Sequence, residues 1–304
     1  KTYAQGSGGV FSTTSGTSWG PKISELPNDA TYGGNTDNEY TQKFGKQQGK
    51  YYVPQRAAAG LDPWATPQAY DNAKDFFDTG ITWSNSLNVA QMLDKSSYSI
   101  SLGNTHQDGI ISSTGMDRYN VKVSADTKLT NNWSSGFTAN YITTSIDKAV
   151  TSGNGLLRTV YAAPPSYDLA GIPSHVDGNP YTQNSFRGSF DNAYWAMENN
   201  KFTEDTNRFF GNVYASYQTD FGTTNHKLNA KYMVGVDAYT THYVDSYGYG
   251  SNTGGGRGQI ENYGWTNATY NSLLTINYDW HINEDWGLNA VVGNEIIQSN
   301  RKKY

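Results

Sequence analysis

The side chains best suited to acid, base or metal chemistry are dispersed along this chain. Its five histidines show no metal-binding spacing such as HExxH, and those at or near expected turns are better interpreted as solvated surface. The absence of cysteine excludes a disulfide framework, a thiol nucleophile and a cysteine-ligated metal. We therefore expect no metal and no cofactor. The histidines are His106, His175, His226, His242 and His281.

Two motifs imitate active-site signatures. The glycine-rich segment from Thr253 to Gly258 lacks the Gly-Lys-Ser/Thr ending and the following helix of a phosphate-binding loop, so it predicts a flexible exposed loop. Glycosidases need two converging carboxylates, but Glu204 and Asp205 are adjacent, and adjacent side chains of a strand point in opposite directions. The pair at 284–285 lies in an expected turn. We therefore expect that the chain is not an enzyme.

Large aromatic residues in otherwise polar segments are stronger candidates for function. Aromatic faces can stack on sugar rings and can also pack against peptides. The alternative interpretation is that these rings hold long loops together. Lys201 could contact substrate or a lid protein, and Phe202 is a further aromatic residue of these segments. The candidate substrate-binding residues are Tyr51, Tyr52, Trp64, Arg187, Tyr194 and Trp195.

The segment 117–144 shows which elements would position these residues. Apolar and polar residues alternate on both sides of a short polar turn, which predicts a β-hairpin. Each arm has about ten residues, the length of a tilted transmembrane strand. In a soluble sandwich the apolar face would be the core. In an outer-membrane barrel it would meet lipid, and Lys122, Asp126 and Lys128 would face the lumen.

The same alternation predicts about eight strands from residue 82 onward. Short turns alternate with longer connections at 106–116, 145–206 and 246–258. This asymmetry is typical of outer-membrane barrels, as is an aromatic girdle, and it assigns the apolar face to lipid. Residues 1–81 have no sustained period and predict a long extracellular loop region, with a helical turn or two within 69–77. The residues that flank the short turns are Trp133, Phe221, Trp280 and Trp286.

Composition agrees with this assignment. The 304 residues are 36% hydrophobic and 14% aromatic, and the mean hydropathy of −0.70 argues against helical membrane spans. A net charge of −5 makes a nucleic-acid partner unexpected. The chain has no signal peptide at Lys1 and stops within a strand pattern at Tyr304, so we expect a fragment.

The expected fold is therefore all-β: a partial antiparallel transmembrane β-barrel with long extracellular loops. Two alternatives remain open. One is a soluble or surface β-rich glycan-binding or adhesin domain, in which a second sheet would bury the apolar face. The other is a secreted polysaccharide-degrading enzyme, which would need convergent carboxylates.

Several short motifs also resemble the SusC/RagA class of TonB-dependent outer-membrane transporters. Their order and spacing run through most of the chain. The motifs are Ser18-Trp19-Gly20-Pro21-Lys22-Ile23, Asp75-Phe76-Phe77-x-Thr79-Gly80, Tyr98-Ser99-Ile100-Ser101, Asp108-Gly109-Ile110-Ile111, Asp117-Arg118-Tyr119-Asn120, Lys128-Leu129-Thr130-x-x-Trp133, Asn140-Tyr141, Arg158, Pro164-Pro165-x-x-Asp168-Leu169 and Gly178-Asn179-Pro180-Tyr181.

The resemblance implies a nutrient importer in the outer membrane of a Gram-negative bacterium of the Bacteroidota. Such proteins are 22-stranded barrels with an N-terminal plug in the lumen. They import oligosaccharides or peptides, driven by the TonB–ExbB–ExbD complex, and a SusD-like surface lipoprotein caps the barrel. No TonB box, plug or final strand is found here, so the chain would represent roughly the first third of the barrel.

Overall fold

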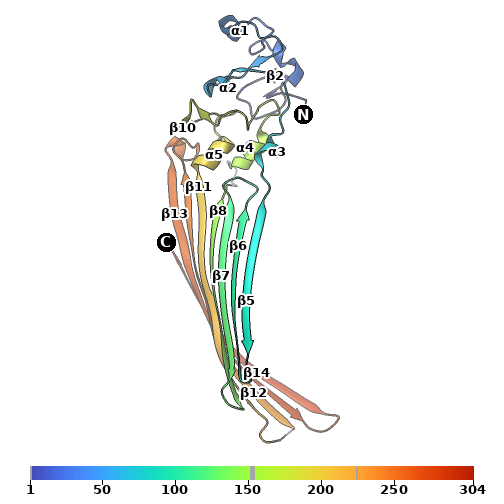
Figure 1. The fold of residues 1–304 in the computed structure, drawn as a ribbon, viewed down its shortest axis with the longest axis vertical. Coiled ribbons are helices and arrows are strands. Elements are labelled where there is room, and N and C mark those ends of the chain that lie inside the picture. The colour runs from blue at the N-terminus through green and yellow to red at the C-terminus, as the bar shows by residue number, and fades with distance from the viewer. Residues whose placement is uncertain (1, 151–154, 224) are drawn as a thin grey trace.

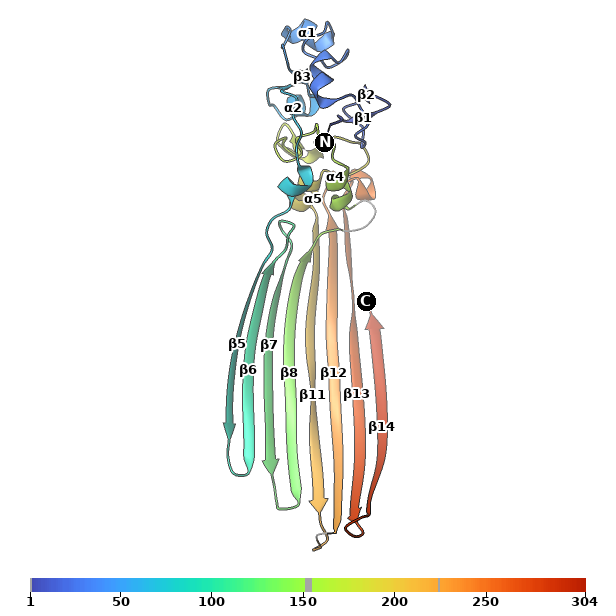
Figure 2. The same cartoon turned by 90° about the vertical axis from the view of Figure 1, so that its right-hand side faces the viewer.

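The computed structural model describes residues 2–150, 155–223 and 225–304. Eight long strands form one antiparallel sheet in which each strand pairs with its neighbour in the chain (Figures 1 and 2). This confirms the eight predicted strands. The sheet is open, with β5 and β14 at its two edges. The strands are β5 (Ile81–Met92), β6 (Ser96–Asp108), β7 (Gly115–Lys128), β8 (Trp133–Lys148), β11 (Lys201–Thr219), β12 (His226–Tyr247), β13 (Gln259–His281) and β14 (Gly287–Lys303).

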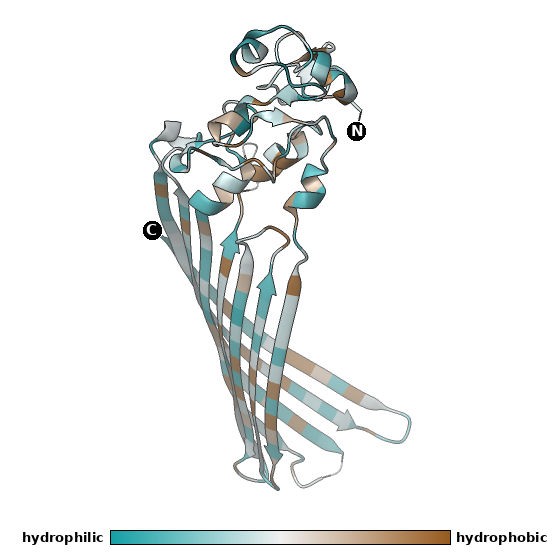
Figure 3. Cartoon of the chain, turned by 45° about the horizontal axis from the view of Figure 1, so that its top comes forward, coloured by the Kyte–Doolittle hydropathy of each residue, from teal (hydrophilic) through white to brown (hydrophobic). Residues whose placement is uncertain are grey.

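The two faces of the sheet follow from the alternation in the sequence. Val121 of β7 pairs with Leu102 of β6 and Tyr141 of β8, and these three side chains share what we call the Val121 face. The next residue, Lys122, points to the opposite side, the Lys122 face. Apolar and polar residues are interspersed along the strands accordingly (Figure 3).

The Val121 face has no covering layer in the part of the chain that the structure describes. Val121, Phe137 and Val213 on this face expose 41%, 43% and 53% of their surface. The other sheets among the described residues have two strands each and lie in the segments at one end of the long sheet, so none of them covers the Val121 face as the sandwich alternative requires. No described helix is long and apolar enough to cross a membrane.

The strands extend further than the sequence pattern indicates. Each long connection between strands is therefore shorter than predicted: 109–114 in place of 106–116, 149–200 in place of 145–206, and 248–258 in place of 246–258. The difference arises because β6, β8, β11 and β12 continue past their apolar residues. Polar cross-strand pairs take over in these extensions. Ser145 donates to Asp205 at 2.6 Å, for example, and a strand needs no apolar alternation where such pairs form.

A glycine allows one hydrogen bond to cross a whole strand on the Lys122 face. Gly136 of β8 lies between Asp126 of β7 and Tyr214 of β11, and the Tyr214 hydroxyl donates to Asp126 Oδ1 at 2.6 Å. A Cβ atom on Gly136 would lie 2.2 Å from Asp126 Oδ1. Because Gly136 has no side chain, this hydrogen bond can connect β7 with β11 across β8.

The segments 2–80, 155–200 and 248–258 fold together at one end of the sheet, which we call the loop domain (Figure 1). Within 2–80 the elements are short, as expected for a loop region with short local structure, and α3 lies within the predicted helical turn at 69–77. The extracellular placement of these residues stays a prediction. The short elements are β1 (Gly6–Ser7), β2 (Val10–Phe11), η1 (Ile23–Asn28), α1 (Glu39–Phe44), β3 (Tyr51–Tyr52), α2 (Pro54–Ala58), β4 (Trp64–Ala65), α3 (Asn72–Phe76), α4 (Leu156–Ala162), β9 (His175–Val176), β10 (Asn179–Gln183), α5 (Ala193–Asn199) and η2 (Thr253–Gly256).

The loop domain has its own apolar core, which joins its distant segments. Leu26, Val160 and Phe186 are each no more than 1% exposed and belong to the same cluster. Buried amides satisfy backbone groups that no strand ladder reaches. Asn72 donates to the carbonyls of Pro164 and Tyr167, at 3.1 and 3.0 Å. Residues 2–80 and residues 155–200 therefore share one core.

Candidate functional site

Aromatic side chains on the Lys122 face are confined to three neighbouring strands. The uninterrupted pairing register places eight of them on β11, β12 and β13. At the equivalent positions of β5 to β8 and β14, the described residues are not aromatic. An aromatic region therefore occupies one part of an otherwise polar wall. Its members are Phe202, Phe210, Tyr214, Tyr239, Tyr243, Tyr247, Tyr263 and Trp265.

Three of these rings pack against one another and form what we call the aromatic patch. Tyr243 stacks on Tyr263 with 5.0 Å between ring centroids and 9° between planes. Tyr243 also contacts Trp265 at 5.1 Å. Tyr263 is 37% exposed, so part of its surface is open to a ligand.

Charged groups surround the aromatic patch. The Lys148 ammonium lies 4.4 Å from the Tyr243 centroid and 3.3 Å from Glu204 Oε2. The Tyr263 hydroxyl donates to Asp245 Oδ2 at 3.2 Å. Stacking faces beside polar groups bind amphipathic ligands. Among the described residues, no group of three His, Cys, Asp or Glu could hold a metal ion.

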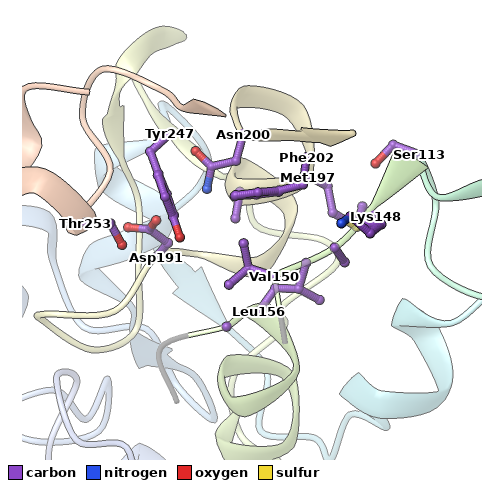
Figure 4. Close-up of a pocket in the computed structure, with 13 residues that line it drawn as sticks. Ser113, Lys148, Val150, Leu156, Asp191, Met197, Asn200, Phe202, Tyr247 and Thr253 are labelled. Atoms are coloured by element: carbon purple, nitrogen blue, oxygen red, sulfur yellow. The ribbon is translucent and has the colours of Figure 1, made fainter. Parts of the chain in front are cut away.

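A small pocket joins the aromatic region to the loop domain (Figure 4). Lys148, Phe202 and Tyr247 line it from the strands, and Leu156 and Met197 line it from α4 and α5. It encloses only about 30 Å³. Because Lys148 contacts both the pocket and Tyr243, the aromatic patch lies next to the loop domain.

The buried carboxylate of Asp191 fixes the loop between β12 and β13 to the 155–200 segment of the loop domain. Its Oδ2 accepts from Ser251 Oγ at 2.6 Å, and its Oδ1 accepts from the Asn252 backbone at 2.7 Å. The Asn252 amide and Gln183 Nε2 also donate to Oδ1, at 2.8 and 2.7 Å. These four hydrogen bonds offset the cost of burying the charge.

Four of the six predicted substrate-binding residues lie in the interior of the loop domain. Tyr51, Tyr52, Trp64 and Trp195 are between 0% and 8% exposed. Tyr51 donates to the Ser166 carbonyl at 2.9 Å, and Trp195 Nε1 donates to the Pro180 carbonyl at 2.8 Å. Their present packing matches the alternative interpretation, in which such rings hold long loops together. Substrate contact by these residues stays a prediction.

The other two predicted residues are partly exposed. The Tyr194 hydroxyl donates to the Asp75 carbonyl at 3.3 Å. Arg187 stacks on Phe190, 3.7 Å from the ring centroid. The structure brings Tyr52 into contact with Trp64 at 5.5 Å, but substrate contact by these six residues also stays a prediction.

The aromatic patch could not be recognised from the apolar alternation, for a physical reason. In the halves of β12 and β13 nearest the loop domain, aromatic and polar residues occupy both faces, so the apolar alternation stops at Ala238 and resumes at Ala268. Tyr263 and Trp265 are two residues apart, however, which places both on one face of a strand. Two aromatic residues at this spacing, beside a polar partner strand, are the sequence feature from which the aromatic patch could have been predicted.

Buried tyrosines give the loop domain a specific sensitivity to base. Burial raises the pKa of Tyr51 and Tyr167, so both phenols stay neutral when folded. An unfolded tyrosine ionises near pH ~10. Their contribution to stability is therefore complete below pH ~10 and is lost as pH rises toward the folded pKa.

We expect Tyr167→Phe to leave stability at neutral pH within about 0.5 kcal/mol of the parent, because the Tyr167 hydroxyl has no hydrogen-bond partner. Above pH ~10 the variant should lose less stability than the parent. Tyr51→Phe, by contrast, should cost about 1 kcal/mol at neutral pH through the lost bond to Ser166. Denaturant midpoints at neutral and alkaline pH measure both. Equal alkaline losses in parent and Tyr167→Phe would contradict the expectation.

Comparison with known proteins shows that this chain resembles solved structures at the level of the fold. No protein-family model and no curated protein matches the chain. The "closed-closed" and "open-open" structures of the RagAB peptide importer each match with a TM-score of 0.60 and 16% identity over 77% of this chain. A structure of the RagAB peptide transporter matches with a TM-score of 0.58 and 17% identity over 78%. The chain covers only 26–27% of those chains.

Proposed function

We propose that this chain forms part of the wall and outer loops of an outer-membrane nutrient importer. The observation that carries the proposal is the long eight-stranded sheet whose apolar Val121 face has no cover among the described residues. Lipid is the partner that such a face requires, and the opposite polar face then lines a lumen. The fold similarity to the RagAB structures supports this placement.

In the complete protein, the sheet would continue into a barrel of about 22 strands. The motif resemblance to SusC/RagA transporters supports a plug domain in the lumen, a SusD-like surface lipoprotein above the loop domain, and energy supply by TonB–ExbB–ExbD. The transported substrate is a peptide or an oligosaccharide, and the peptide importers among the similar structures favour a peptide. In this proposal the substrate passes through the importer chemically unchanged.

Substrate contacts the aromatic patch during passage. We expect replacement of both Tyr263 and Trp265 by alanine to lower uptake of a labelled oligopeptide by at least about tenfold, since exposed aromatic anchors dominate binding energy. Uptake is measured in cells that produce the full-length transporter.

The matched control is Tyr270→Ala, which removes a half-exposed ring from the Val121 face of the same strand. It should reach the membrane in equal amount and transport normally. Normal uptake in the double variant, with equal surface level, would contradict a role for the patch. If Tyr270→Ala also lost uptake, the loss in the double variant would be explained by impaired folding of β13 and not by lost substrate contact.

A further inference from the structure

Arg187 is a half-buried cation without a carboxylate partner among the described residues. Its guanidinium lies 3.7 Å from the Phe190 centroid and 5.6 Å from the Phe186 centroid. Its Nη2 donates to Thr159 Oγ1 at 3.1 Å. Stacking and one neutral hydrogen bond leave most of the five guanidinium donors unused.

Arg187 Nε is one of two buried side-chain polar atoms in the described chain that have no hydrogen-bond partner. The other is Tyr167 Oη. Both side chains pack against Phe186, the Tyr167 ring at a centroid distance of 5.3 Å. Both atoms carry a hydrogen to donate, and buried donors without acceptors are costly. The surroundings of Phe186 therefore lack an acceptor.

A second cation lies close by. The Arg158 guanidinium is 5.1 Å from the Phe190 centroid, so two positive groups contact one ring. Burial, followed by the charge of Arg158, lowers the pKa of Arg187. Like charges held close together repel, and this repulsion adds to the cost of burying Arg187.

Gly16 leaves room for the Arg187 side chain because it has no side chain of its own. A Cβ atom on Gly16 would lie 3.2 Å from Arg187 Cδ and 3.5 Å from Nη1. The N-terminal segment can thus approach the guanidinium closely without covering it with a side chain. The site therefore joins two segments of the loop domain, 2–80 and 155–200, around one cation.

We propose that Arg187, with Arg158 beside it, binds a carboxylate group of the imported substrate. A carboxylate matches the planar guanidinium fork and can accept from the Nη donors that Thr159 does not use. The proposal rests on the proposed import function, because it names the substrate as acidic. The carboxylate can belong to a peptide or to a uronic acid, and the probes separate these sources.

The test uses the full chain purified in detergent and titrated by calorimetry. The probes are N-acetylglycine and methyl glucuronide, each compared with its neutral twin, N-acetylglycinamide or methyl glucoside. We expect one carboxylate probe to bind at least about tenfold more tightly than its neutral twin, and Arg187→Gln to abolish this preference. Arg257→Gln, which removes an exposed arginine of the loop domain, should keep it.

Arg187→Lys is tested as well, in case Arg187→Gln fails to fold. It keeps the charge but loses the fork, so it should fold and bind more weakly than the parent. Equal binding of the charged probes and their neutral twins overturns the proposal, and so does an unchanged preference in folded Arg187→Gln. Neither result bears on the proposed import function, because that function is tested separately, by uptake and by the placement of the sheet in the membrane.

Discussion

Trp195→Ala should destabilise the loop domain by about 3–5 kcal/mol, the cost of removing a fully buried tryptophan. The ring is 0% exposed, and its Nε1 donates to the Pro180 carbonyl. It also lies against the β12–β13 loop, where a Cβ atom on Gly250 would be 3.4 Å from the ring. The loss therefore removes apolar contact and the link between β10 and α5 together.

Limited proteolysis of the full chain in detergent measures this effect. We expect cleavage within 2–80 and 155–200 to accelerate strongly, while β5 to β8 stay protected. Trp19→Ala is the matched control, because that ring is 70% exposed and its removal should change little. Unchanged protease resistance of Trp195→Ala would show that the loop domain does not depend on this ring.

Asp191→Ala should have an effect of similar size, about 3–5 kcal/mol, because breaking a buried charged network leaves its donors unpaired. Ser251, Asn252 and Gln183 all donate to this carboxylate. Their donors would stay buried without an acceptor. Asp191→Asn should be milder, since one amide oxygen can still accept.

Hydrogen exchange of the backbone at 248–258 is the direct readout. The Asn252 amide, which donates to Asp191, should exchange much faster in Asp191→Ala. Asp37→Ala serves as the control, because that side chain is 84% exposed and pairs only with Lys46 at the surface. Equal exchange at 248–258 in Asp191→Ala and the parent would mean that the loop is held by other contacts.

The sheet could be predicted from the sequence because its information is local. A strand with one apolar face repeats every two residues, so Val121, Val123 and Ala125 reveal their common side without knowledge of any partner. The short turns could be located for the same reason. The strand ends could not, because they depend on cross-strand polar pairs such as Ser145 with Asp205.

The loop domain could not be predicted because its contacts join residues far apart in the chain. Gln5 Nε2 donates to the Phe186 carbonyl, 181 residues away, and Asn184 donates to the Gln55 carbonyl, 129 residues away. No periodicity records such pairs. The aromatic residues were noticed as unusual, but nothing local distinguishes a buried ring such as Trp195 from an exposed one such as Trp19.

The central claim is that the Val121 face meets lipid and the Lys122 face does not. Because these 304 residues contain no cysteine, a single cysteine can be placed in them and labelled with an environment-sensitive fluorophore, after replacement of any cysteine elsewhere in the full-length protein. The informative positions are neighbours in sequence on opposite faces: Val121 and Lys122 of β7, and Val213 and Asn212 of β11.

Quenching by lipids that carry a spin label on the acyl chain is the most direct measurement, made on the full-length protein in bilayers. If the Val121 face meets lipid, quenching is strong at 121 and 213 and weak at 122 and 212. Equal quenching within each pair, or stronger quenching at 122 and 212, would contradict this claim.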